Sequence, residues 1–395
     1  MTEPTGLEEA CLRAADSLEG SLTEMSDSFF LSPEVGLEER RTSAAMREFL
    51  AGFGFAVEAP VGGLETAFRA VVGKGPPVVA LLAEMDALPG IGHGCGHNIG
   101  GVASVGAAAA LAGAVGDRLK AGGGTVIVLG TPAEESGTGK ADMIRAGVFD
   151  GVDAAMMVHA SSARTVVKHF LGLVELRFTF HGRSAHASAY PEDGINALDG
   201  VIQTFNSINA LRQHLPIESR VHGIITDGGR APNIVPDRAE ALFFVRAADP
   251  ATLDRIKERV VRCAEGAAVA MGCRLDREQV GTTTAPMKIN AAFADLYRGA
   301  LDYLGLAEDP KPPYMNVGSS DIGDVSQVVP AIHPHVPLSA GLRIHTREFA
   351  AATATPEGHR ALMEGVKALG LTALKLLFDP AALDVVKEDF RSGGG

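Results

Sequence analysis

Three short, almost uninterrupted apolar runs in the first half of the chain restrict its fold more than any other feature. They are VVALLAE at 78–84, TVIVLG at 125–130 and DAAMMV at 153–158. Runs of this length and composition are typical of strands buried on both faces, as in a parallel sheet covered by helices. Helical stretches separate the runs. The sequence therefore predicts an α/β fold with a central, mostly parallel sheet flanked by helices.

The pattern changes near residue 171, where GLVELRFTFHG alternates as a half-buried strand does. Two more strand-like segments and the helical stretch TLDRIKERVVRCAEGAAVAMG follow. Helical patterns return after residue 285, and 395 residues exceed what one hydrophobic core usually supports. We predict a smaller α+β domain at 171–285, inserted into a larger domain formed by 1–170 and 286–395.

The composition argues against nucleic-acid binding. With a formal net charge of −13 and no basic tract, the chain lacks the clustered Lys and Arg that phosphate contacts require. The four cysteines, Cys11, Cys95, Cys263 and Cys273, lie far apart in a long chain, which is unlike a disulfide framework. We expect a protein of the reducing cytoplasm without a nucleic-acid partner.

The segment IGGVASVGAAAALAGAVG at 99–116 comes closest to a membrane span. It is barely long enough, and it consists mainly of Gly and Ala. We predict a buried, closely packed helix here instead. The N-terminal segment is acidic and amphipathic and has no feature of a signal peptide, so we expect no membrane partner.

Polar side chains follow each apolar run at the point where the run ends. Asp86 follows the first run, Glu134 and Glu135 follow the second, and His159 follows the third. Open α/β sheets gather their ligands at the carboxyl ends of the strands. We therefore expect these side chains to face one site.

The residues at these positions suit divalent metal ions. GIGHGCGHN at 90–98 carries a cysteine and a histidine two residues apart in a glycine-rich loop, which lets both face one point. Two adjacent ionised glutamates repel each other unless a cation or a shared proton relieves them. Two ions about 3.5–4 Å apart could be held by Cys95, His97, Glu135 and His159 together with one more donor from the C-terminal part.

A metal pair of this kind indicates amide hydrolysis. It lowers the pKa of bound water to about 7 and polarises a carbonyl. Glu134 is then free to take the proton from the water and pass it to the leaving amine. An alternative is a cysteine hydrolase with Cys95 as nucleophile and His93 or His97 as base, but it leaves the glutamate pair unexplained.

Six motifs follow one another from about residue 80 to 350: LLAEMDALPGIGHGCGHN, GTPAEESGTGK, HGRSAHASAYPEDGINALD, APNIVP, GSSDIGDVS and HTREF. In sequence and in order they resemble the dinuclear metallohydrolase superfamily that contains aminoacylase, glutamate carboxypeptidase and succinyl-diaminopimelate desuccinylase. They are similar to its amidohydrolase branch, and nearest to β-alanyl-lysine-type dipeptidases and aminobenzoyl-glutamate hydrolases. At one position the chain departs from the peptidase branches, because Glu84 stands where they carry a histidine ligand.

The resemblance implies a role for each matching residue of the larger domain. Cys95, His97, Glu135 and His159 match metal ligands, Glu134 the general base, and Asp86 an acidic residue that orients a ligand. His345 in IHTREF matches the last ligand. His333 in AIHPH is the alternative for that position, and His335 is a more distant one.

The resemblance also assigns residues of the inserted domain, which it implies to be a lid and dimerisation domain. His186 matches a histidine that the partner subunit of a homodimer supplies to stabilise the oxyanion. Asn233 and Arg246 match substrate-binding residues, and the planar guanidinium of Arg246 suits a carboxylate. The loop Gly318–Asp321 matches one that lines the pocket.

The sequence thus predicts a metal-dependent dipeptidase or amidohydrolase with two Zn²⁺ or Mn²⁺ ions, Co²⁺ being a further possibility. The substrate would be a small dipeptide or N-acyl amino acid with a free carboxylate. An N-acyl-amino-acid deacylase or an aminobenzoyl-glutamate-type hydrolase is the alternative within the same class. A non-catalytic scaffold is the alternative outside it, although such a relative would be expected to have lost Glu134 or several ligands.

Overall fold

The computed structural model describes residues 6–136, 139–310 and 318–393, and the chain divides into two compact units. The first unit consists of Met1–Lys168, Lys288–Asn316 and Ser320–Gly395. The second consists of His169–Met287 with Val317–Ser319, and its main segment encloses the predicted insert at 171–285. The predicted fold class, a mostly parallel sheet with helices and an inserted smaller α+β part, is confirmed.

The central sheet of the first unit has six strands in the order β1-β2-β4-β3-β5-β11. Strand β3 pairs in parallel with β4 and β5, and β5 pairs in parallel with β11, whereas β2 runs antiparallel to β4. All of β4 is buried, as a strand covered on both faces requires. The bounds are β1 Ala56–Glu58, β2 Phe68–Lys74, β3 Val78–Glu84, β4 Gly124–Thr131, β5 Ala154–Met156 and β11 Ala331–Ile332.

The third apolar run differs in detail from the prediction of one continuous strand. Strand β5 ends at Met156, and a new strand β6 begins at His159 and extends to Ser161. Strand β6 pairs in parallel with β12, His335–Pro337, in a separate two-stranded sheet. His159 therefore begins a short strand whose partner carries His335 directly opposite.

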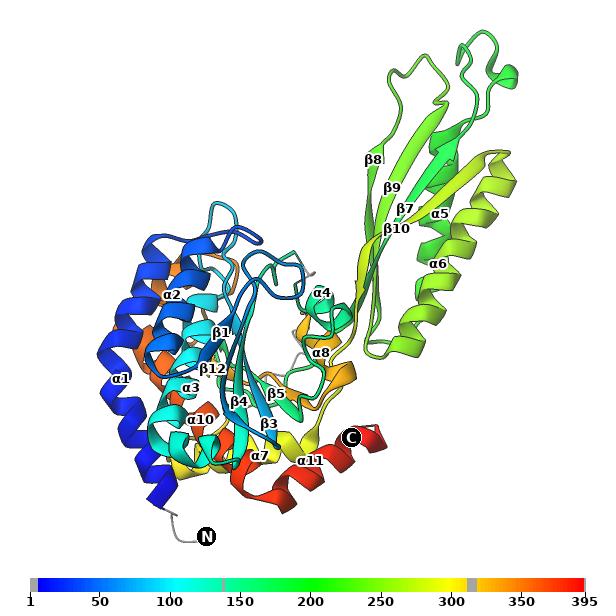
Figure 1. Ribbon diagram of the computed structural model, residues 1–395. Helices are drawn as coiled ribbons and strands as arrows, with labels where there is room; N and C mark the ends of the chain where they lie inside the picture. The colour runs from blue at the N-terminus through cyan, green and yellow to red at the C-terminus, as the bar shows by residue number, and fades with distance from the viewer. Residues whose placement is uncertain (1–5, 137–138, 311–317, 394–395) are drawn as a thin grey trace. The chain divides into compact units, whose positions relative to one another are not determined.

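Helices cover the central sheet, and α1, α3 and α10 pack against one another on one side of it (Figure 1). The amphipathic N-terminal segment forms α1, a helix of 26 residues. The bounds are α1 Gly6–Leu31, α2 Arg40–Gly52, α3 His97–Lys120, α4 Gly139–Arg145, α7 Ala291–Tyr303, α8 Ile322–Val328, α9 Arg347–Ala352, α10 Pro356–Phe378 and α11 Pro380–Ser392.

Helix α3 contains the apolar segment 99–116, and the prediction of a buried helix there is confirmed. By length and composition α3 could cross a membrane, but 83% of its most apolar window is buried inside the protein. Its small residues permit close packing: a Cβ on Gly101 would lie 2.2 Å from the carbonyl oxygen of Glu84. The helix therefore lies directly against β3, which brings its N-terminal residue His97 to the end of that strand.

The second unit is a four-stranded antiparallel sheet in the order β10-β7-β9-β8, with two helices on one face (Figure 1). The strict alternation predicted for GLVELRFTFHG is confirmed, since every second residue of β7 is buried. The bounds are β7 Gly172–His181, β8 Arg220–Asp227, β9 Arg238–Ala247, β10 Arg274–Thr284, the short 3-10 helix η1 Pro191–Asp193, α5 Ala197–Arg212 and α6 Pro250–Met271.

Candidate metal centre and active site

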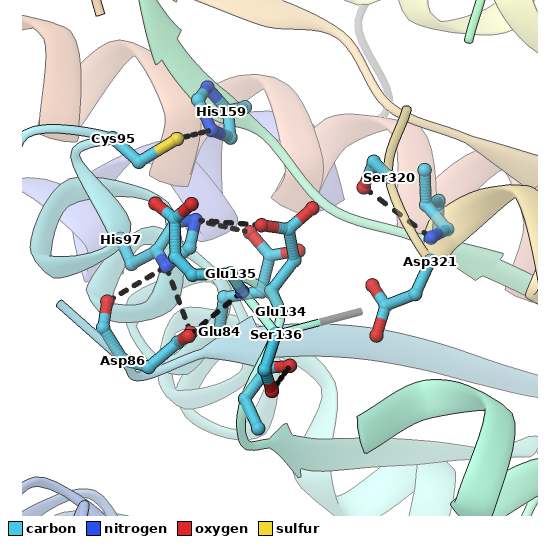
Figure 2. A network of polar contacts seen from close by, with 12 residues as sticks. Glu84, Asp86, Cys95, His97, Glu134, Glu135, Ser136, His159, Ser320 and Asp321 are labelled. Carbon is cyan, nitrogen blue, oxygen red and sulfur yellow. Dashed lines mark hydrogen bonds and ion pairs between the residues drawn. The ribbon is translucent and has the colours of Figure 1, made fainter. Parts of the chain in front are cut away.

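Side chains from five separate segments of the first unit converge at the carboxyl ends of β3 and β4. Figure 2 shows four of these segments from close by, those that carry Asp86, Cys95 with His97, the glutamate pair, and His159. Asp86 follows β3, the glutamate pair follows β4, and His159 begins β6. Cys95 lies in the loop before α3, whose first residue is His97. The fifth segment is the loop before α9, where the backbone N–H of His345 donates to the Gly94 carbonyl at 2.7 Å. The expected meeting of the strand ends is observed.

The His97 ring is fixed through its Nδ1. This atom lies 2.8 Å from the Asp86 carbonyl oxygen and 3.1 Å from Asp86 Oδ1. Both oxygens accept only, so Nδ1 donates and Nε2 is the ring atom left to face the site. Within the described chain, Nε2 is buried and makes no hydrogen bond, and it lies 3.4 Å from Glu84 Oε2 and 3.8 Å from Glu134 Oε2. Burial opposes a charge on the ring, but the carboxylates of Glu84 and Asp86 raise the pKa of His97 well above its usual value. The site therefore favours positive charge at Nε2, which a bound cation would supply in place of the proton.

His159 repeats this arrangement. Its Nδ1 lies 2.6 Å from the Ala160 carbonyl oxygen, which leaves Nε2 directed at Cys95 Sγ, 3.2 Å away. Burial lowers the pKa of His159 to about 4, so the ring is neutral, as a metal ligand must be. Burial raises the pKa of the Cys95 thiol well above its usual range. A buried, protonated thiol is a poor nucleophile, which weighs against the cysteine-hydrolase alternative.

Of the three candidates for the last ligand, His345 lies next to the proposed donors. Its Nε2 is 3.5 Å from Cys95 Sγ and 3.6 Å from Glu135 Oε2. His333 and His335 are buried, and their rings lie with that of His159 in a cluster of centroid distances between 5.3 and 5.4 Å. This geometry supports His345 as the last ligand. His333 and His335 lie beside the ring of His159 instead.

The two glutamates lie in different environments. Glu135 donates its backbone N–H to Asp86 Oδ2 at 3.0 Å, and its carboxylate lies beside Cys95 and His345. The carboxylate of Glu134 is 11% exposed and faces His97. Burial, followed by the nearby carboxylates of Glu84 and Asp321, raises the pKa of Glu134 to about 8. Divalent cations at the site would favour its ionised form.

Asp86 joins the two environments. One of its oxygens lies against the ring of His97 and the other accepts the N–H of Glu135. Burial alone would raise the pKa of Asp86, but these hydrogen bonds lower it below its usual value. The carboxylate is therefore ionised and holds two of the proposed ligands in place.

Glu84, for which the sequence indicated no certain role, belongs to a buried ion cluster. Lys140 Nζ lies 2.7 Å from Glu84 Oε1 and 2.6 Å from Asp321 Oδ1, and the side chains are no more than 1% exposed. The backbone N–H of Lys140 also donates to Asp321 Oδ2 at 3.0 Å. The ammonium neutralises carboxylates that lie beside Glu134, and it fixes Glu84 against His97.

The donors fit divalent metal ions. Several groups of three have ligand atoms within 4.8 Å of one another, and Cys95, His97 and Glu135 each belong to two of them. A buried carboxylate oxygen of Glu135 and His97 Nε2 both lack hydrogen-bond partners within the described chain. Sulfur, imidazole and carboxylate together suit Zn²⁺ and accept Mn²⁺ or Co²⁺. The groups are Cys95 with His97 and His159, Cys95 with Glu135 and His345, His97 with Glu134 and Glu135, and Glu84 with Glu134 and Asp321, so Glu134 also belongs to two of them.

The remaining predicted site residues belong to the second unit, where two of them lie on adjoining segments. The N–H of Ala187 donates to the Asn233 carbonyl at 3.0 Å, beside the bridge between His186 and Ile234. His186 is exposed, and three local donors from Ser188 and Ala189 surround its Nδ1 at 3.3–3.4 Å. Its Nε2 is therefore the atom left to reach another molecule.

Arg246 is half-buried at the end of β9, and its Nη1 donates to Ser319 Oγ at 3.0 Å. Its Nε is buried and has no hydrogen-bond partner among the described residues. Burial lowers the pKa of the guanidinium, which stays charged. A planar guanidinium with a buried N–H that has no partner among the described residues is suited to donate to a carboxylate.

Sequence reasoning missed two residues that shape the site, Lys140 and Glu39. Lys140 stands in GTPAEESGTGK, and a lysine on the first turn of a buried helix directly after the glutamate pair was a usable signal. Glu39 lies far away in the sequence, but its carboxylate accepts the N–H of Ala133 at 2.9 Å. The local sequence contains no signal for that contact.

Known proteins are similar to this chain along nearly its whole length. A family model described as a peptidase dimerisation domain matches residues 170–271. An Xaa-Arg dipeptidase of Mus musculus is 34% identical over 397 residues, which cover 96% of this chain and 91% of that protein. One of the subunits of the p-aminobenzoyl-glutamate hydrolase of Escherichia coli strain K12 is 30% identical over 440 residues, or 93% of this chain and 91% of that protein.

Among solved structures, a Bacillus subtilis protein described as a dinuclear metal-binding peptidase of the M20 family has a similar fold. The TM-score is 0.69 at 20% identity, and the match covers 91% of this chain and 99% of that one. At this identity the likeness concerns the fold.

Proposed function

The chain belongs to the M20 family and is a metal-dependent amide-bond hydrolase, and from this premise we propose that it cleaves dipeptides with a basic C-terminal residue. Similarity along nearly the whole chain to an Xaa-Arg dipeptidase supports the dipeptide. The similarity to an aminobenzoyl-glutamate hydrolase keeps that class of amide as the second candidate. The observation that carries the hydrolytic part of the proposal is the position of Glu134, whose carboxylate lies 3.8 Å from Nε2 of His97, beside the ligands that we assign below.

We assign Cys95, His97, Glu135, His159 and His345 as the residues that hold two divalent ions, Zn²⁺ or Mn²⁺. When bound, the ions supply Lewis acidity to the amide carbonyl and lower the pKa of water. Asp86 keeps Nδ1 of His97 protonated and orients the backbone of Glu135. The carbonyl of Ala160 does the same for His159.

Glu134 is the proton carrier in this assignment. As the base, its carboxylate accepts a proton from the attacking water, and it then donates the proton to the amine that leaves. An environment that raises the pKa of a carboxyl group suits both steps, because the group must hold the proton between them. Lys140 limits this shift by balancing Glu84 and Asp321.

Residues of the second unit complete the proposal. Arg246 would bind the free carboxylate of the substrate, and Asn233 would bind the substrate as well. We further propose a homodimer through the second unit, supported by the match to a dimerisation domain. His186 of each copy would then serve the other copy, its Nε2 donating to the oxyanion. All four cysteines are free, which suits a reducing, cytoplasmic environment.

A substrate panel tests the proposal. Dipeptides with C-terminal Arg, Lys, Glu and Gly, aminobenzoyl-glutamate and an N-acetyl amino acid are each assayed with Zn²⁺, Mn²⁺ or Co²⁺ supplied. We expect turnover of the basic dipeptides, its loss on chelation, and a fall in kcat of at least about 100-fold in Glu134→Gln with the metal content unchanged. Preferential cleavage of aminobenzoyl-glutamate would establish the second candidate, and bound metal without turnover of any substrate would support the scaffold.

A further inference from the structure

The backbone that carries the glutamate pair turns sharply where β4 ends. Ala133 has a φ of 59°, in the left-handed region that residues with a Cβ rarely adopt. Such a conformation persists only where the surrounding structure holds it. Because Ala133 directly precedes Glu134, its conformation sets the direction in which that side chain leaves the strand.

Two buried carboxylates hold this turn from opposite ends. Glu39 Oε1 accepts the N–H of Ala133 at 2.9 Å, and Asp86 Oδ2 accepts the N–H of Glu135 at 3.0 Å. Glu39 is fully buried, and its other oxygen accepts the hydroxyl of Thr66 at 2.7 Å. Glu39 is therefore fixed from one side by Thr66, and its other oxygen accepts from the turn.

The loop that contains Glu39 also supports the turn by direct packing. A Cβ added to Gly36 would lie 3.1 Å from both the Cα and the Cβ of Ala133, so the two backbones are in close contact. Ser136 Oγ donates to the carbonyl of Ala133 at 3.0 Å and closes the turn from its other side. The turn is thus held at its N–H, its carbonyl and its Cβ.

We propose that Glu39 is a positioning residue, whose carboxylate holds the Ala133 turn and thereby aims Glu134 at the reacting centre and Glu135 at the metal ions. The inference rests on the proposed functions of Glu134 and Glu135. Among the described residues, the carboxylate of Glu39 makes hydrogen bonds to Ala133 and Thr66 and none to a proposed ligand, so its contact with the site runs through the backbone of the turn. A turn that relaxes without this contact would displace both glutamates together.

The primary test compares Glu39→Ala with Glu34→Ala. Glu34 lies in the same loop, but its carboxylate accepts from Arg41 and Thr42 at the start of α2 and does not contact the turn. We expect Glu39→Ala to lower kcat about 100-fold, the effect of a displacement of about 1 Å, with little change in KM. Metal affinity should fall as well, because Glu135 moves. Glu34→Ala should lower the melting temperature while kcat and metal affinity stay near the wild-type values.

The conservative variant Glu39→Gln separates geometry from charge. Its amide oxygen can still accept the Ala133 N–H, and the Thr66 hydroxyl can turn to accept from its NH₂ group. We therefore expect Glu39→Gln to recover most of the kcat and the metal affinity. Wild-type kcat in Glu39→Ala, or equal losses of kcat in Glu39→Ala and Glu34→Ala, would overturn the proposal.

A second perturbation covers the case in which Glu39→Ala does not fold. Gly36→Ala presses a methyl group on Ala133 without touching Glu39, whereas Gly20→Ala adds one where no atom lies within 4 Å. We expect a fall in kcat and in metal affinity for Gly36→Ala, and none for Gly20→Ala. Unchanged values in Gly36→Ala would contradict the inference. Metal affinity is measured with a competing chelator, so it tests the turn even if the wild type cleaves no substrate of the panel. Absence of cleavage by the wild type would refute only the proposed function.

Discussion

Replacement of Lys140 by methionine tests the buried ion cluster of the site. The ammonium lies 2.7 Å from Glu84 and 2.6 Å from Asp321, and its side chain is 0% exposed. At an effective dielectric constant of 20, each pair attracts with about 6 kcal/mol, most of which offsets the desolvation of the ions. Methionine fills a similar volume but removes the attraction and leaves both carboxylates buried. We therefore expect the free energy of unfolding to fall by about 3–5 kcal/mol.

A surface pair of the same length provides the matched control. Lys367 Nζ lies 2.6 Å from Asp16 Oδ1, but the two side chains are 29% and 56% exposed. Water replaces the lost partner there, so Lys367→Met should lower stability by no more than about 1 kcal/mol. The two variants remove Lys–carboxylate pairs of nearly the same length, two at Lys140 and one at Lys367, so a loss more than twice as large in Lys140→Met reports on burial.

The assay is calorimetric unfolding of chelator-treated protein, since bound metal would add its own stabilisation to the folded state. The double variant Lys140→Met with Asp321→Asn should regain part of the loss, because only one buried carboxylate then lacks its partner. A loss in Lys140→Met no larger than that in Lys367→Met would refute the reasoning. A double variant less stable than Lys140→Met would do so as well.

Two further predictions concern the metal donors. His345→Ala should lose metal affinity and turnover, whereas His333→Ala should keep both near the wild-type values and lose only some stability. Dialysis followed by metal analysis checks this prediction. The reverse result would make His333 the ligand. Because burial raises the pKa of the Cys95 thiol, the metal-free protein holds that proton at neutral pH and metal uptake must expel it. Release of this proton should therefore make metal affinity rise by about tenfold per pH unit. Cys95→Ser should reduce this pH dependence, and an unchanged pH dependence in that variant would contradict the prediction.

The sequence was most informative where local pattern and local chemistry coincide. The runs at 78–84 and 125–130 predicted β3 and β4 because strands buried on both faces carry apolar residues without alternation. The alternation of β7 was equally direct. Edge strand β10 was missed, since most of its residues are polar and exposed and so lack the pattern of a half-buried strand.

The donor residues were visible for the same reason. A strand end next to Glu134 and Glu135, and a glycine-rich loop with Cys95 and His97, are features of a few consecutive residues. The choice between His333 and His345 could not be made from such features, because both are histidines in loops of the C-terminal part. The hydrogen bond from the His345 N–H to the Gly94 carbonyl distinguishes them, and it brings His345 to Cys95 across 250 positions of the chain.

The sequence by itself determined which segments become buried strands and which chemical groups stand at their ends, because periodicity and residue type are local properties. Only the tertiary structure decided which distant groups support them. Glu39 meets the Ala133 turn across 94 positions, and Lys140 meets Asp321 across 181. Such contacts leave no local pattern, since packing sets them only after the strands and helices have assembled.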